Sequence, residues 1–176
     1  MTLAQAYYAL AAGLLLAGGL LLGDAPVLRT FRRSSAATWL LGLAAIAWFA
    51  WWLVTMPEAD LAGLPRTPVI LLFMAACLAT FFTMPDFLAV RALAVLMLFL
   101  ARAALDAGYR QLPQSLLEAS LSYGVLILFG FWWACSPPVF CRQCDWVLAR
   151  DHRRLILGGT CLALALACLA QSFVLP

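Results

Sequence analysis

The chain has 176 residues, of which 66% are hydrophobic and 11% charged, and its mean hydropathy is +0.99. Soluble domains are about 45–50% apolar and about 25% charged. This composition excludes soluble, disordered, collagen-like and disulfide-scaffold proteins and leaves a small multi-pass membrane protein. A net charge of +3 is too small for a nucleic-acid partner, so we expect no nucleic-acid binding.

Six apolar stretches are each long enough, or nearly so, to cross about 30 Å of hydrocarbon as a helix. In chain order they cover residues 3–22, 36–55, 68–84, 87–109, 116–135 and 155–174. The sequence therefore predicts an all-α fold, a polytopic bundle of six transmembrane spans that forms one integral membrane domain over residues 1–176. A five-span alternative requires one of these stretches to lie flat on the membrane.

Two helix boundaries carry local signals. Only Met84, Pro85 and Asp86 separate the third stretch from the fourth, which predicts a tight antiparallel hairpin. Before the fifth stretch, Ser115 and Glu118 have the spacing of a capping box, in which the two side chains satisfy backbone N–H groups of the first turn. The pattern predicts a helix that begins at residue 116.

The segment 136–154 is the one substantial piece outside the six stretches. Ser136 followed by two prolines can begin a helix, because proline is tolerated in a first turn. Apolar residues such as Phe140 and Trp146 alternate here with four arginines. We expect a short interfacial helix between spans five and six, held partly by anionic lipid.

The arginines orient the bundle, because basic residues concentrate on the cytoplasmic side of membrane proteins. With the N-terminus outside, the inner side carries Arg29, Arg32, Arg33, Arg91, Arg142, Arg150, Arg153 and Arg154, and the outer side carries Arg66, Arg102 and Arg110. This asymmetry predicts a protein of the bacterial inner membrane with both termini in the periplasm.

Cys141 and Cys144 form the one motif with a recognised chemical use, since a Cys-x-x-Cys pair can cycle between dithiol and disulfide or supply half of a zinc site. They are weak redox candidates, because the pair is expected on the reducing side and no second dithiol is available. Cys77, Cys161 and Cys168 lie within apolar stretches, which excludes a secreted disulfide framework.

His152 is the only histidine. On a continuous helix it would lie roughly 16 Å from Cys141, which is too far for both to bind one ion. We therefore expect neither a metal site nor another cofactor.

The fourth stretch contains charged residues that are unusual for a membrane span. Arg91, Arg102 and Asp106 fall on nearly one helical face, and Arg102 and Asp106 are four residues apart, so they can form an ion pair. Charged groups inside a span normally face protein or water. These three residues are our candidates for contact with a partner or ligand, and we expect the pair to face a neighbouring helix or another subunit.

The sixth stretch carries small residues at intervals of three and four, which lets helix backbones approach closely in lipid. They are Gly158, Cys161, Ala165, Cys168 and Ser172. This pattern predicts close helix packing as the role of the two cysteines.

These observations favour a non-catalytic accessory or scaffold subunit that lies in the lipid bilayer with other membrane subunits, as a hetero- or homo-oligomer. A membrane thiol-disulfide oxidoreductase using Cys141 and Cys144 is the first alternative. A small transporter for an apolar or anionic solute is the second, and a polar cavity at mid-membrane would favour it.

Overall fold

The computed structural model describes residues 1–23, 25–57, 65–83 and 87–175, and every regular element in these ranges is helical. The elements in chain order are α1 (Leu3–Leu22), α2 (Ala25–Thr30), η1 (Phe31–Arg33), α3 (Ser35–Thr55), α4 (Arg66–Thr83), α5 (Leu88–Gly108), α6 (Leu116–Leu121), the π-helical turn η3 (Ser122–Ile127), α7 (Leu128–Cys135), α8 (Pro137–Leu148) and α9 (Asp151–Val174).

Five of the described helical stretches are long and apolar enough to cross a membrane. They are α1, α3, α5, α9 and the continuous stretch Leu116–Cys135, which α6, η3 and α7 form together. Helix α4 coincides with the third predicted span, and its described apolar part, Arg66–Ala76, is shorter than the others. The predicted turn at Met84, Pro85 and Asp86 lies outside the described residues.

Local capping explains where the first helices begin. The Thr2 hydroxyl accepts a hydrogen bond from the Gln5 N–H at 3.2 Å, and the Gln5 side chain accepts one from the Thr2 N–H at 2.9 Å. Ser34 caps α3 by accepting from the Ala37 N–H at 3.2 Å. These bonds satisfy N–H groups that a helix leaves unpaired at its N-terminus, which matters most in a membrane.

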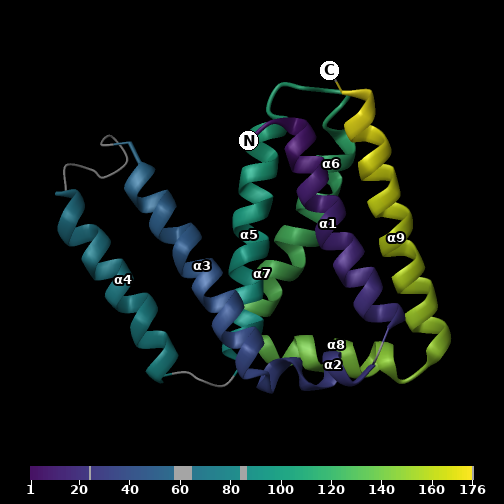
Figure 1. Cartoon of the computed structure of the whole chain (residues 1–176), viewed down its shortest axis with the longest axis horizontal. Coiled ribbons are helices and arrows are strands. Elements are labelled where there is room, and N and C mark those ends of the chain that lie inside the picture. Colours follow the sequence, from purple (N-terminus) through teal and green to yellow (C-terminus); the bar gives the residue numbers. More distant parts are fainter. Residues whose placement is uncertain (24, 58–64, 84–86, 176) are drawn as a thin grey trace.

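The described chain consists of a body and an arm (Figure 1). Helices α1, α5, α9 and the α6–α7 stretch form the body, and α3 and α4 form an arm beside α5. In Figure 1, α3 lies between α4 and α5, so the third and fourth predicted spans are not packed as a tight hairpin. Helices α2 and α8 lie across one end of the body, and both chain termini lie at the other end.

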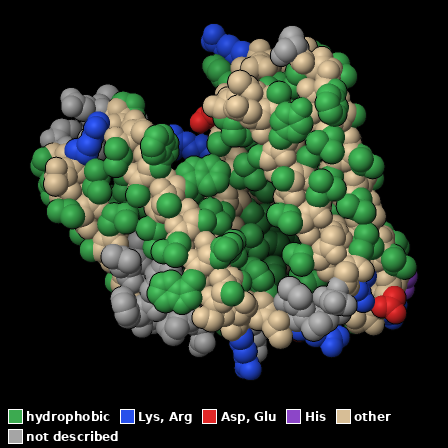
Figure 2. Space-filling model, in the orientation of Figure 1, with side chains coloured by type: hydrophobic (Ala, Val, Ile, Leu, Met, Phe, Trp, Pro, Cys, Tyr) green, Lys and Arg blue, Asp and Glu red, His purple; other side chains and the backbone are tan. Residues whose placement is uncertain are grey.

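The face seen in Figure 2 is mostly apolar along the length of the helices, and most charged side chains gather at its two ends. This is the distribution expected when long apolar helices cross hydrocarbon and charged groups stay at the headgroup level. A notch separates the arm from the body, and acidic and basic side chains lie in that notch (Figure 2).

The most extensive helix pairing joins α1 to α9, the first and last helices of the chain. Gly18 and Gly158 lie at the contact, and a Cβ added at Gly18 would come within 3.2 Å of the Gly158 carbonyl oxygen. On α9 the buried residues are Gly158, Ala165, Cys168 and Ser172. The small-residue stripe therefore permits close packing, as predicted.

Arg154 ties the same two helices together at the end that carries α2 and α8. Its Nε donates a hydrogen bond to the Leu21 carbonyl at 3.2 Å, and a terminal nitrogen donates to the Gly23 carbonyl at 2.5 Å. These carbonyls lie in the last turn and at the C-cap of α1. The carbonyl oxygens at the C-terminal end of a helix have no N–H donors within the helix, so a cation is favoured there.

The segment between spans five and six differs in part from the prediction. Helix α8 ends at Leu148, and after a break at Ala149 and Arg150 the chain begins α9 at Asp151. His152, Arg153 and Arg154 thus belong to α9 rather than to a separate interfacial helix. The sequence did not reveal this because the polar first turn of α9 resembles the polar face of an amphipathic helix.

The α1–α9 contact predicts opposite effects for two adjacent glycines. Gly18→Leu should lower the stability of the protein in detergent by about 1–3 kcal/mol, because the new side chain meets the backbone of α9. Gly19→Leu is the matched control, since a Cβ at Gly19 meets nothing within 4 Å and leucine is a better helix former than glycine. Thermal unfolding followed by circular dichroism measures both, and equal destabilisation by the two variants would contradict this packing.

Candidate functional site

The structure brings together two of the three charged candidates on α5. Arg102 Nε lies 3.8 Å from Asp106 Oδ2, which confirms the predicted pair. The Arg102 guanidinium also lies over the ring of Trp52 on α3, 4.9 Å from its centroid. Such a cation–π contact directs the Arg102 guanidinium toward the neighbouring helix α3.

That pair is still widely accessible on the surface of this chain. The side chains of Arg102 and Asp106 are 56% and 75% exposed. Arg102 lies seven residues before Tyr109, and thus roughly 10 Å along the axis from the end of α5. Trp52 therefore covers only one side of a charged pair within a membrane-length helix.

Arg91 lies about 16 Å from Arg102 along α5, near the end of the molecule that carries α2 and α8. Between the two arginines, aromatic rings join α5 to the arm. Phe99 stacks on Phe49 of α3 at 6.0 Å, and Phe49 meets Phe73 of α4 edge-on at 5.8 Å. The charged face of α5 thus has two separate polar ends with an apolar, aromatic middle.

Cys141 and Cys144 lie in α8 as free, half-buried thiols. With Leu28, Arg29 and Asp145 they line a small cavity of about 150 Å³ between α2 and α8. The other described cysteines are also free, and the side chain of Cys77 lies outside the described residues. No group of three or more potential metal-binding side chains occurs in the described part of the chain.

The environment of Cys144 disfavours thiol chemistry. Burial is the main cause that raises the pKa of the Cys144 thiol to about 11, and the nearby Cys141 and Asp145 contribute in the same direction. The thiolate is the reactive form, and a catalytic cysteine has a pKa below its usual value rather than above it. Cys144 is thus a poor nucleophile at neutral pH.

Glu118 does not form the capping box that the sequence predicted. The Ser115 side chain makes no capping hydrogen bond, and the Glu118 side chain points into the body with 1% of its surface exposed. Its Oε1 accepts a hydrogen bond from the Ser122 hydroxyl at 2.8 Å. Its Oε2 is buried without a hydrogen-bond partner among the described residues.

Tyr7 of α1 joins this buried cluster to the rest of the body. Its hydroxyl donates a hydrogen bond to the Gln114 carbonyl at 2.6 Å and accepts one from the Glu118 N–H at 3.3 Å. The tyrosine thus satisfies a backbone N–H that a capping side chain would otherwise bind. Tyr7 and Glu118 are more than a hundred residues apart in the chain, so no local pattern could have indicated their contact.

Close packing and an irregular backbone surround the cluster. A Cβ at Gly108 of α5 would overlap Glu118 Oε2, so a larger residue there requires the Glu118 side chain to shift. The π-helical turn η3 begins at Ser122, directly after the Glu118 turn. One signal was present in the sequence: Glu118 and Ser122 are four residues apart and therefore share a helical face.

Comparisons with known proteins found no matching family model, no matching curated protein and no matching solved structure.

The pKa of Cys144 predicts a steep pH dependence of its alkylation. At pH 7 roughly one Cys144 thiol in ten thousand is ionised, and the rate should rise about tenfold per pH unit up to a pH of about 11. Iodoacetamide labelling of the intact protein, followed by peptide mass spectrometry, measures this rate. Exposed Cys135 reports that the reagent reaches the protein. Rapid labelling of Cys144 at pH 7 would contradict the assignment and would favour thiol chemistry.

The tyrosine cluster predicts a large difference between two neighbouring substitutions. Tyr7→Phe removes two buried hydrogen bonds and leaves the Gln114 carbonyl and the Glu118 N–H unpaired, at a cost of about 1–3 kcal/mol. Tyr8→Phe is the matched control, because Tyr8 is 46% exposed. Thermal unfolding in detergent compares the two variants. If Tyr7→Phe proves no less stable than Tyr8→Phe, the hydroxyl does not join α1 to the fifth span.

Proposed function

We propose that this chain is a non-catalytic accessory subunit with six membrane spans, and that the face of α5 carrying Arg102 and Asp106 binds another membrane subunit. Helix α4 would supply the sixth span. An even number of crossings agrees with the two chain termini lying at the same end of the molecule (Figure 1). Helix α8 would lie at the membrane interface, since it runs across the ends of the long helices.

The exposed ion pair carries the proposal. Arg102 and Asp106 are more than half exposed, yet they belong to a helix of membrane-spanning length and composition. Charged side chains in hydrocarbon are costly and normally face protein or a water-filled space. Five guanidinium donors cannot be satisfied by one aspartate and one indole ring. A partner subunit with polar groups at this depth would supply the missing contacts.

The arginine asymmetry supports an orientation for the assembly. Arg29 lies in α2, Arg33 in η1 and Arg142 in α8, at the end away from the termini. By the positive-inside rule we assign this end to the cytoplasmic side of a bacterial inner membrane and the termini to the periplasmic side. The exposed pair then lies toward the periplasmic end, where the partner would contact it.

No observation on the described residues favours either alternative function, the thiol oxidoreductase or the transporter. A thiol oxidoreductase needs a reactive cysteine, whereas the pKa of Cys144 is raised to about 11. A transporter needs polar groups around a path through the membrane, whereas the larger described cavity is lined by apolar residues apart from Arg91.

Photo-crosslinking tests the partner in the native host. Tyr109 is 69% exposed and lies three residues from Asp106, so this position has room for the larger benzoylphenylalanine side chain, which samples the proposed face. Phe173 of α9, 79% exposed, is the control position. We expect a discrete crosslinked protein from position 109 and none from position 173.

Two further variants connect this crosslink to the ion pair. Arg102→Leu leaves Asp106 unpaired and should reduce the crosslink yield about tenfold. The double change Arg102→Leu with Asp106→Ala removes the unpaired charge and should recover part of the chain's stability but not the crosslink. Equal labelling from positions 109 and 173, or a yield that Arg102→Leu leaves unchanged, would contradict the proposal.

A further inference from the structure

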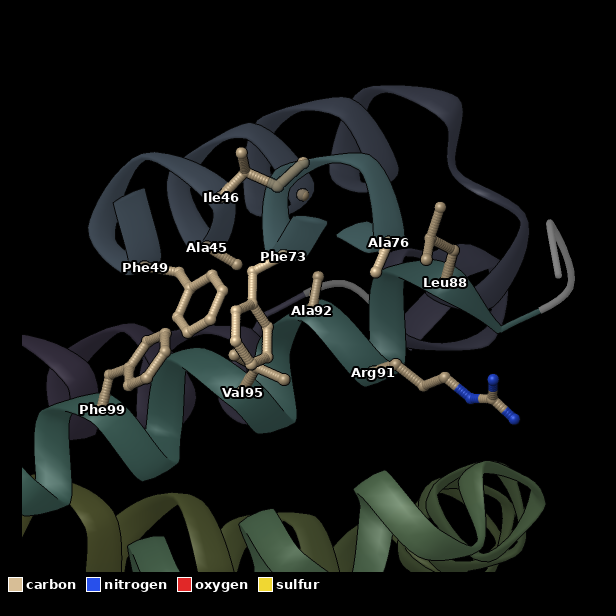
Figure 3. Close-up of a pocket in the computed structure, with 11 residues that line it drawn as sticks. Ala45, Ile46, Phe49, Phe73, Ala76, Leu88, Arg91, Ala92, Val95 and Phe99 are labelled. Atoms are coloured by element: carbon tan, nitrogen blue, oxygen red, sulfur yellow. The ribbon is translucent and has the colours of Figure 1, made fainter. Parts of the chain in front are cut away.

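A cavity of about 430 Å³ lies between α3, α4 and α5. Phe49, Phe73 and Phe99 come from the three different helices and point toward one another in it, and Val95 and Ile46 extend the apolar lining (Figure 3). The guanidinium of Arg91 points away from these apolar side chains at one end of the cavity (Figure 3). The cavity is therefore an apolar slot with one cationic end.

The length of the slot matches half of a bilayer. On α5 its lining extends from Leu88 to Phe99, which is roughly 16 Å along the helix axis. The hydrocarbon of one leaflet is about 15 Å deep, half of the whole core. Leu88 is the first residue of α5, so the slot occupies the half of the helix nearest to α2 and α8.

The volume decides between a hydrocarbon chain and a helix as the occupant. A transmembrane helix about 10 Å across would occupy roughly 1,250 Å³ over this length, about three times the space available. An extended acyl chain in van der Waals contact with its neighbours is about 5 Å across and fills roughly 300 Å³. The cavity of about 430 Å³ has room for the chain and is much smaller than the helix.

Charge specifies the head group. Arg91 is the fourth residue of α5, at the level where the slot meets the end carrying α2 and α8. A guanidinium has five donors in a planar fork that matches a phosphate, and one guanidinium can bind a phosphate together with other groups. Arg29, Arg33 and Arg142 lie on elements at the same end and make it favourable for anionic lipid.

We propose that this slot binds one acyl chain of an anionic phospholipid from the leaflet next to α2 and α8, with the lipid phosphate at Arg91. The lipid fills the space between the arm and the body and holds α4 against α5. This site is separate from the proposed partner face, because the Arg102–Asp106 pair lies beyond Phe99 toward the other end of α5. It stands whether or not a partner subunit exists.

The test uses phosphatidylglycerol with a photoreactive diazirine in one acyl chain, in trace amount in phosphatidylcholine vesicles that contain the full chain. Peptide mass spectrometry locates the adducts. We expect adducts on peptides containing Ile46, Phe73 and Phe99 at about ten times the yield on exposed Leu166 of α9. A matched phosphatidylcholine probe should give about one-tenth of the yield in the slot, because its choline cation offsets the charge of its phosphate and weakens the attraction to Arg91 and the neighbouring arginines.

Two pairs of variants identify the chain site and the head-group site. Ala76→Trp fills the slot from an exposed position of α4 and should reduce slot labelling about tenfold, whereas Ala163→Trp makes the same change on exposed α9 and should leave it unaltered. Arg91→Gln should abolish the preference for phosphatidylglycerol, and Arg110→Gln, which removes the same charge from an exposed position beyond the other end of α5, should retain it.

The proposal is wrong if labelling of the slot equals that of Leu166, or if Ala76→Trp and Ala163→Trp behave alike. It is also wrong if the slot is filled by a second copy of the chain. That case would appear as a dimer in size-exclusion chromatography with light scattering, lost in Ala76→Trp. If Ala76→Trp fails to fold, the two arginine-to-glutamine variants still test the proposal. They change the preference for one lipid head group over the other without filling the slot.

Discussion

The close approach of α1 and α9 is the contact on which the rest of the body depends. It joins the first helix of the chain to the last, and it requires Gly18 to face the backbone of Gly158. In lipid there is no hydrophobic driving force between helices, so close van der Waals contact must hold them together. Arg154 secures the same pair by binding the carbonyls at the end of α1. With the two helices joined, Tyr7 of α1 faces the Leu116–Cys135 stretch.

Glu118 and Asp106, two acidic residues of the body, lie in different environments. Glu118 is enclosed by protein, with Ser122 as its hydrogen-bond donor and Gly108 packed against its second oxygen. Asp106 is left on the surface with Arg102 as its partner. Glu118 is shielded from lipid by the protein around it, although its Oε2 has no hydrogen-bond partner among the described residues, whereas a charged pair exposed on a span normally faces protein or water. Glu118 therefore belongs to the packing between helices of the body, whereas the exposed Arg102–Asp106 pair is the basis of the proposed partner face.

The arm leaves space that the chain does not fill itself. Helix α3 packs on α5 through aromatic rings, with Phe99 near both Trp48 and Phe49, while α4 lies on the far side of α3 (Figure 1). Three helices that diverge cannot close the gap between them with side chains of ordinary size. In a bilayer such a gap is occupied by the surrounding solvent, which is hydrocarbon. The proposed lipid slot and the proposed partner face both follow from an arm that is not packed along its whole length.

The residues of each apolar stretch by themselves determined where the helices lie, because a span must satisfy its backbone within one continuous segment. Thr2 and Ser34 mark helix starts, the small residues of α9 indicate a close contact, and the spacing of Arg102 and Asp106 indicates their pairing. Only the tertiary structure decided which surfaces meet. Glu118 has the spacing of a helix cap, yet it is buried because Tyr7, more than a hundred residues away, takes over the capping bond. The slot between α3, α4 and α5 is equally invisible in the sequence, since its residues have the composition of any lipid-facing helix and differ only in what lies opposite them.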